Sequence, residues 1–176
     1  LTSIDVKVPG DISAATFWMV AGICHPDARI KIVNVGVNPT RTGAIGVLKS
    51  MGACIYYQSE RMEGSEEVAD LVIESSSLEG TEISGDIIPN IIDEIPALAV
   101  AACFANGTTT FKNAEELRYK ESDRISKTVK ELSSLGASIE ELSDGMIIQG
   151  TAGLKGGVCE ANGDHRLAMA LGVAGI

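Results

Sequence analysis

The sequence predicts an α/β domain with internal pseudo-symmetry, because two kinds of segment recur along the chain. Three stretches begin with an aspartate and continue into small apolar residues, starting at Asp11, Asp93 and Asp164. Between them, a pattern of strand, loop, helix and strand occurs over residues 30–55 and again over residues 109–139. A unit of core helix, strand, loop, amphipathic helix and two strands therefore repeats about twice, and a third copy begins at Asp164.

The three aspartate-led stretches are predicted to form buried helices. A short carboxylate at a helix N-cap accepts hydrogen bonds from first-turn amides, so each aspartate is expected to cap the helix that follows. The side chains after each aspartate are almost all apolar or small, which indicates burial on every side. If the three helices aim their N-terminal ends at one region, their dipoles would attract phosphate groups there.

The second copy of the strand, loop, helix and strand pattern, over residues 109–139, gives the clearest helix boundaries. Ser122 or Asp123 is placed to cap an amphipathic helix, and Gly136 supplies the left-handed residue that ends it. Two short strands, over residues 138–142 and 146–149, are expected to follow. The apolar stripe of the helix consists of Ile125, Thr128, Val129, Leu132 and Leu135.

Composition excludes several classes of function. The chain has 176 residues, of which 45% are hydrophobic, enough for one domain or two small ones. The net charge of −10 argues against a nucleic-acid surface, and every apolar run is too short to span a membrane. The four cysteines lack metal-ligand spacing, which favours thiols in a reducing cytosol. Because no motif suggests a metal or nucleotide site, we expect no metal and no cofactor.

Charged clusters occupy two predicted helix starts. Lys120, Glu121 and Arg124 precede or begin one helix, and His165 and Arg166 begin another. A cation in the first turn meets the positive end of the helix dipole, so these arginines are expected to have an anionic ligand. The alternatives are solvated capping charges for the first cluster and an ordinary packed histidine for the second.

Asp93 has two interpretations. The first is the N-cap role that it shares with the other two aspartates. The second is functional, because Asp93 lies among apolar residues in the segment 89–96. Partial desolvation there would raise the pKa of the Asp93 carboxyl towards the range of a general base.

Five motifs resemble those of the 5-enolpyruvylshikimate-3-phosphate synthases, a family of enolpyruvyl transferases, in order and across nearly the whole chain. The most specific feature is the Lys-Glu-Ser-Asp-Arg motif, followed at residue 164 by Asp-His-Arg. The motifs are Pro9-Gly-Asp-Ile-Ser-Ala-Ala, Val37-Asn-Pro-Thr-Arg-Thr-Gly, Ile92-Asp-Glu-Ile-Pro, Leu117-Arg-Tyr-Lys-Glu-Ser-Asp-Arg and Gly163-Asp-His-Arg-Leu-Ala-Met-Ala.

The resemblance implies one domain of an inside-out α/β barrel, with a pseudo-threefold repeat of buried helices and outer mixed sheets. Residues 1–176 would form a single incomplete domain, with repeats at 1–80, 81–150 and a truncated 151–176. The active site of the family lies in the cleft between this domain and a first domain of the same protein. The sequence opens without methionine or a signal pattern, so we expect a piece of a longer protein. Because the resemblance places the active site between two domains, we expect this piece to be inactive by itself.

The activity that the resemblance implies is a step of aromatic amino acid biosynthesis in the cytoplasm. The enolpyruvyl group of phosphoenolpyruvate would move to the 5-hydroxyl of shikimate 3-phosphate, with release of phosphate. Asp93 would be the base towards the attacking oxygen. Glu121 would exchange a proton with the methylene of phosphoenolpyruvate, and His165 would support it from nearby.

The resemblance also assigns three substrate-binding residues. Lys120 would contact shikimate 3-phosphate, while Arg124 and Arg166 would clamp phosphoenolpyruvate, a task that suits planar bidentate guanidinium groups. Two alternatives stay open. One is the related transferase that acts on UDP-N-acetylglucosamine, and the other is a non-catalytic folding or binding module.

Overall fold

The structure is a computed structural model that describes residue 3 and residues 6–176. The expectation of a longer protein rests partly on the first five residues, and four of these lie outside the described part. None of the helices in that part is long and apolar enough to cross a membrane. In chain order the elements are α1 (Ile12–Cys24), β1 (Arg29–Gly36), α2 (Gly43–Ser50), β2 (Cys54–Glu63), β3 (Glu66–Glu74), β4 (Glu82–Ile83), η1 (Gly85–Ile87), α3 (Ile88–Ile91), α4 (Ile95–Cys103), β5 (Thr108–Phe111), η2 (Glu115–Tyr119), α5 (Arg124–Ser134), β6 (Ser138–Leu142), β7 (Gly145–Gln149) and α6 (His165–Ala174).

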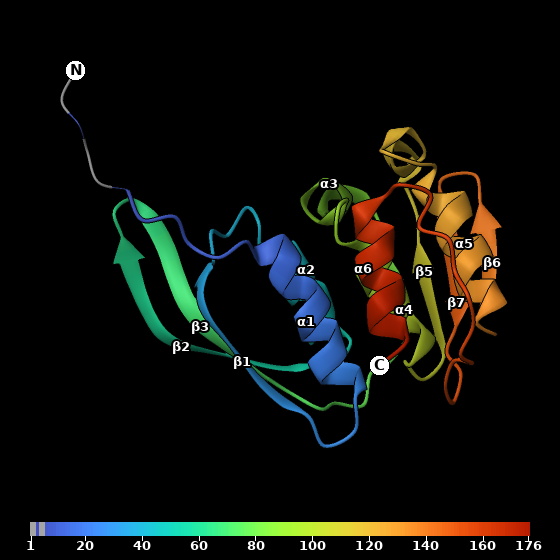
Figure 1. Ribbon diagram of the computed structural model, residues 1–176, viewed down its shortest axis with the longest axis horizontal. Helices are drawn as coiled ribbons and strands as arrows, with labels where there is room; N and C mark the ends of the chain where they lie inside the picture. The colour runs from blue at the N-terminus through green and yellow to red at the C-terminus, as the bar shows by residue number, and fades with distance from the viewer. Residues whose placement is uncertain (1–2, 4–5) are drawn as a thin grey trace.

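Two small sheets flank a group of core helices. One sheet has the strand order β1-β3-β2 and the other the order β4-β5-β7-β6. Helices α1, α4 and α6 pack against one another between them (Figure 1). Helix α1 also contacts β1 and β3, whereas α4 contacts β7. The layered α/β arrangement that the sequence predicts is confirmed.

The two sheets share one pattern of connections. The strand after the core helix, β1 or β5, pairs antiparallel with β3 or β7, which in turn pairs antiparallel with β2 or β6. In both sheets, the segment before the core helix pairs in parallel with the strand that follows this helix. Gly10 bridges Val35 in the first sheet, and β4 pairs with β5 in the second. The repeat in the sequence is therefore also a repeat in topology.

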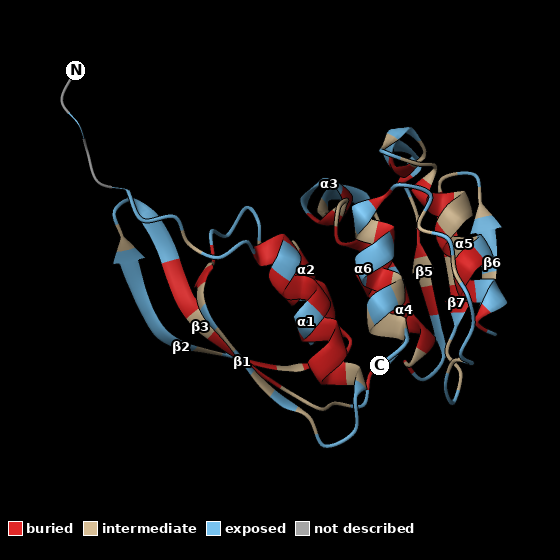
Figure 2. Cartoon of the chain, in the orientation of Figure 1, coloured by how far each residue is buried: buried red, intermediate tan, exposed pale blue. Residues whose placement is uncertain are grey.

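The fraction of buried residues in the core helices decreases from α4 through α1 to α6. Every residue of α4 is buried, and ten of the 13 residues of α1 are buried. In α6 only Leu167 and Ala170 are buried, and Met169 is 37% exposed (Figure 2). The prediction of burial on every side is therefore confirmed for α4, nearly so for α1, and wrong for α6. Helix α6 packs on α1, α4 and α5, but no sheet of the described residues covers its outer face.

The capping predictions hold for two of the three aspartates. The Asp11 carboxylate accepts two first-turn amides at 3.1 and 3.0 Å, and Asp164 accepts two at 3.0 and 3.3 Å. The prediction for Asp93 is wrong. A turn in near-helical conformation joins α3 to α4, with the Glu94 amide donating to Ile91 at 2.9 Å, so Glu94 takes the cap position. Asp93 lies one residue earlier, and its side chain turns towards α5.

Helix α5 and its stop residue follow the sequence prediction. Asp123 caps the helix by accepting the Ser126 amide at 3.0 Å. Gly136, after the last turn, has φ of +89°, a left-handed conformation that side chains with a Cβ rarely adopt. The predicted stripe faces inward, with Ile125, Thr128 and Leu132 buried.

Replacing Gly136 by alanine should lower the free energy of unfolding by about 1–2 kcal/mol, because alanine pays a steric cost in the left-handed region. A Cβ at Gly136 would meet only Lys155 side-chain carbons, at 3.5 Å or more, so the cost lies in the backbone. Gly46, inside α2 with open space around it, is the matched control. Gly46→Ala should raise stability by about 0.5–1 kcal/mol. Urea unfolding followed by circular dichroism measures both, and equal effects of the two substitutions would contradict this account.

Candidate active site

Arg124 is the centre of a cluster of charged side chains. Although it is the first residue of α5, its side chain is only 1% exposed. Its Nη1 donates to Asp93 Oδ1 at 2.9 Å, its Nε donates to Asp164 Oδ2 at 2.8 Å, and its Nη2 contacts the Glu121 carboxylate. One guanidinium thus faces three carboxylates, which come from the α3–α4 turn, the start of α6 and the loop before α5.

Asp164 has two tasks in this cluster. It is completely buried, caps α6 through one carboxylate oxygen, and accepts Arg124 Nε and the Ser122 hydroxyl, the latter at 3.0 Å, through the other. Burial acts to raise the pKa of the Asp164 carboxyl, but hydrogen bonds from Arg124, the Leu167 amide and Ser122 outweigh it and lower that pKa. Asp164 therefore stays ionised and fixes Arg124 to the start of α6.

Arg124 stays charged for the corresponding reason. Burial disfavours its cationic form, but the hydrogen bond to Asp164 and the nearby carboxylates outweigh this and raise its pKa. Sequence reasoning expected an anionic ligand at this helix start. In the structure, three carboxylates of the chain itself supply the anionic partners, so the electrostatic conflict with the helix dipole is resolved without a ligand.

Asp93 and Glu121 are the more accessible members of the cluster. Their side chains are 36% and 47% exposed, whereas Asp164 is closed off from solvent. His165 Nδ1 lies 3.7 Å from Glu121 Oε1, on the solvent side. The structure therefore brings together Asp93, Glu121, Arg124 and His165 from separate segments of the chain.

Lys120 and Arg166 lie beside this group with looser contacts. Lys120 Nζ pairs with Glu116 Oε1 at 2.5 Å, four residues earlier in η2. Arg166 Nη1 is 3.9 Å from Glu94 Oε1, and neither atom has a hydrogen-bond partner among the described residues. Among the described residues, each of these two cations thus has one acidic partner within 4 Å, whereas Arg124 has three.

The N-terminal ends of the three core helices converge on this region. Arg124 links Asp93, just before α4, to Asp164 at the start of α6. Ser13 in the first turn of α1 accepts a hydrogen bond from Arg41 at 3.0 Å, and both act on the pKa of Glu94. The convergence expected from the sequence is therefore present, and it places positive dipole ends beside the charged cluster.

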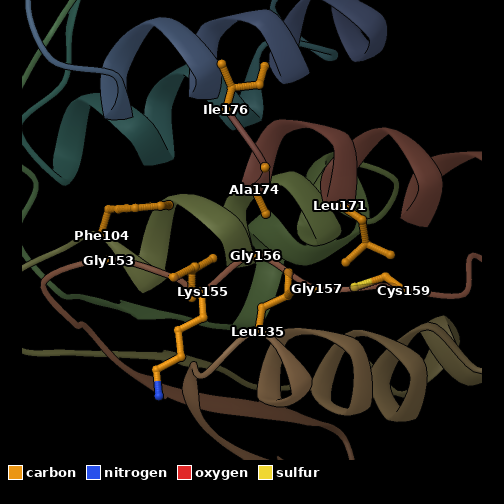
Figure 3. Close-up of a pocket in the computed structure, with 12 residues that line it drawn as sticks. Phe104, Leu135, Gly153, Lys155, Gly156, Gly157, Cys159, Leu171, Ala174 and Ile176 are labelled. Atoms are coloured by element: carbon orange, nitrogen blue, oxygen red, sulfur yellow. The ribbon is translucent and has the colours of Figure 1, made fainter.

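A cavity of about 480 Å³ lies elsewhere, along the C-terminal half of α6 (Figure 3). Its walls combine apolar side chains with the glycine-rich backbone of residues 153–157, and the Lys155 amino group points away from it. Helix α6 is about 15 Å long at 1.5 Å per residue, which separates this cavity from the cluster at its N-terminus. Without an inward-facing charged group, the cavity does not suit an anionic substrate.

Sequence reasoning missed several members of the site. Glu94 and Ser13 lie in two of the quoted motifs but received no individual role, and the role given to Asp164 was that of a cap. Arg41 lies in the motif of residues 37–43 but received no role. An available signal was that a glutamate beside Asp93, at the start of a wholly apolar helix, needs a partner when buried.

Comparisons with known proteins agree across the whole chain. The family described as EPSP synthase (3-phosphoshikimate 1-carboxyvinyltransferase) matches residues 1–176. A 3-phosphoshikimate 1-carboxyvinyltransferase of Desulforamulus reducens is 54% identical over 176 residues, covering 100% of this chain and 41% of that relative. One from Herpetosiphon aurantiacus is 54% identical over 173 residues, covering 98% of this chain and 40% of that relative.

Solved structures give the same result. An EPSP synthase of Acinetobacter baumannii matches with a TM-score of 0.94 and 41% identity, over 99% of this chain and 41% of that one. The enolpyruvyl transferase NikO of Streptomyces tendae matches with a TM-score of 0.67 at 18% identity, over 97% of this chain and 37% of that one, a likeness of fold alone. The chain spans about two fifths of the length of the relatives that it matches.

Proposed function

Because the chain belongs to the EPSP synthase (3-phosphoshikimate 1-carboxyvinyltransferase) family, we propose that it supplies one side of an active site for enolpyruvyl transfer. The donor is phosphoenolpyruvate, the acceptor is the 5-hydroxyl of shikimate 3-phosphate, and phosphate is released. The observation that carries the proposal is the shared contact of Asp93 and Glu121 with Arg124, which groups two accessible carboxylates around one cation.

Each carboxylate has a distinct proton to move. Asp93 takes the proton of the 5-hydroxyl while the hydroxyl oxygen forms a bond to C2 of phosphoenolpyruvate. Glu121, in its acid form, donates a proton to C3, which gives a tetrahedral intermediate. Glu121 then removes a proton from C3, and the bond from C2 to the phosphate oxygen breaks. The leaving phosphate takes up the proton that Asp93 holds, so both carboxyl groups return to their starting forms. His165 supports Glu121, and Lys120 binds the phosphate of the acceptor.

Binding of phosphoenolpyruvate requires an exchange of partners at Arg124. The guanidinium is 1% exposed, and Asp93 and Glu121 occupy its outer nitrogens, while the buried Asp164 holds its Nε. An incoming carboxylate or phosphate would displace the two outer carboxylates but leave the Asp164 contact in place. Displacement would release Asp93 and Glu121 for proton transfer at the moment the donor arrives. Arg166 is the second arginine of the clamp.

Substrate discrimination tests this function. The full-length enzyme should release phosphate from phosphoenolpyruvate with shikimate 3-phosphate as acceptor and show no release with UDP-N-acetylglucosamine. The motifs of residues 120–124 and 164–166 support the first acceptor over the second. Turnover with the UDP-sugar alone would assign the protein to the related transferase, and absence of binding to either acceptor would favour a non-catalytic module.

The isolated 176-residue chain should have little or no turnover. The relatives are more than twice as long, and we propose that a further domain of the same protein closes the site and adds phosphate-binding groups. A phosphate-release assay on the purified chain, with the full-length enzyme as the positive control, measures the difference. Comparable rates would refute the need for a second domain.

The domain division and the location are further parts of the proposal. One incomplete domain with repeats at 1–80, 81–150 and 151–176 is supported by the two sheets, which span residues 29–74 and 82–149. The order β1-β3-β2 of the first sheet recurs as β5-β7-β6 in the second, which adds β4 at its edge. A cytoplasmic location is supported by the four cysteines, which are all free thiols.

A further inference from the structure

Glu94 is a buried carboxylate that has no part in the proton transfers above. It is 5% exposed, and it occupies the N-cap position of α4 without capping the helix through its side chain. Its Oε1 has no hydrogen-bond partner among the described residues. A buried carboxylate with an unpaired oxygen is costly, so the surroundings of Glu94 indicate what it does.

Those surroundings come from all three core helices. Arg166 of α6 is the nearest cation, with 3.9 Å from its Nη1 to Glu94 Oε1. Ser13 of α1 and Arg41 also lie near enough to act on the pKa of Glu94, and Arg41 donates a 3.0 Å hydrogen bond to the Ser13 hydroxyl. Burial raises the pKa of the Glu94 carboxyl, Ser13, Arg166 and Arg41 act to lower it, and Asp93 raises it further. Arg166 is therefore the cation in contact with this buried carboxylate, and Arg41 acts on it from farther away through charge.

Arg166 has fewer acidic partners than Arg124. Arg124 contacts three carboxylates, but among the described residues Glu94 is the only acidic partner within 4 Å of Arg166. Arg166 is 15% exposed in its side chain, and a guanidinium carries five N–H donors. One long contact to Glu94 therefore leaves donors of Arg166 for an external anion.

We propose that Glu94 is a positioning residue that orients Arg166 towards the anionic donor substrate, an inference that rests on the proposed function. Glu94 anchors one edge of the guanidinium where the helix N-termini converge, and Ser13 and Arg41 favour the ionised form of Glu94 that this role needs. The 3.9 Å contact shortens to a hydrogen bond when the donor binds, since contacts in an unliganded site are often long and tighten in the complex. Glu94 touches no substrate and acts through Arg166.

Kinetics of the full-length enzyme carry the first test. Glu94→Gln should raise KM for phosphoenolpyruvate about tenfold, equivalent to roughly 1.4 kcal/mol, while kcat and KM for shikimate 3-phosphate stay nearly unchanged. In an Arg166→Ala background the same substitution should have no further effect on KM for phosphoenolpyruvate, because the residue through which Glu94 acts is absent. Glu115→Gln, an exposed change in η2, is the control and should leave all three constants unaltered.

A second readout does not depend on the substrate. Crystal structures of the full-length wild-type and Glu94→Gln enzymes should show the Arg166 guanidinium displaced from the start of α4 in the variant. An unmoved Arg166, or an equal rise in KM in the Arg166→Ala background, would overturn the inference. Parallel losses in kcat and both KM values would overturn it too, because they indicate a general structural role. A wild-type enzyme inactive with phosphoenolpyruvate would instead refute the proposed function, and the crystal comparison would still test the contact.

Discussion

Glu121→Gln in the full-length enzyme should lower kcat by about 10²–10⁴, the usual contribution of a positioned acid or base. Glutamine has nearly the shape of glutamate and can still accept a hydrogen bond from Arg124, but it cannot exchange a proton with the methylene carbon of phosphoenolpyruvate. KM for both substrates should therefore change little. Steady-state phosphate release at saturating concentrations of both substrates measures the effect.

The control for this prediction is Glu115→Gln, which removes an exposed carboxylate six residues earlier in the chain. It should leave kcat unchanged. If both substitutions have equal and small effects, Glu121 has no part in proton transfer. A rise in KM without a fall in kcat would assign Glu121 to substrate binding in place of proton transfer.

Asp164→Ala should lower the free energy of unfolding by about 3–5 kcal/mol, the range for breaking a buried ion pair by removal of one partner. Asp164 and Arg124 are 0% and 1% exposed, so solvent does not screen their interaction. The substitution also removes the cap of α6 and leaves Ser122 without its acceptor. Urea unfolding at neutral pH measures the loss.

Asp11 provides a matched control within the repeat. It caps α1 through two amides as Asp164 caps α6, but no cation pairs with it among the described residues. Asp11→Ala should therefore cost only about 1 kcal/mol, the usual value of an N-cap. Equal losses for Asp11→Ala and Asp164→Ala would show that the ion pair with Arg124 adds nothing to stability.

The pH dependence of the Asp164 contribution follows from its lowered pKa. Because the folded state binds the Asp164 proton less tightly than the unfolded state, the stabilisation is fully present above the ordinary pKa of 3.8. It is lost as the pH falls from that value through the lower pKa of the folded state. The difference in stability between wild type and Asp164→Asn should therefore shrink over this acidic range, and a constant difference would contradict the assignment.

The sequence by itself determined the architecture and most members of the site. Apolar stretches led by Asp11 and Asp164 were enough to place α1 and α6, because N-capping and the run of apolar residues after the cap are local properties of the chain. Gly136 marked the end of α5 for the same reason. The motifs also singled out Glu121, Arg124 and the other charged residues that the structure gathers around the convergent helix ends.

Only the tertiary structure decided how these charges pair. Asp93 does not occupy the N-cap position of α4, because a near-helical turn joins α3 to α4. Arg124 pairs with carboxylates of its own chain, whereas the sequence suggested an external anion. The Arg124 contacts with Asp93 and Asp164 span 31 and 40 residues of sequence. No local pattern encodes such pairs, since their geometry depends on how α4, α5 and α6 pack together. The same packing buried Glu94 beside Arg166 and left the outer face of α6 uncovered by the described sheets.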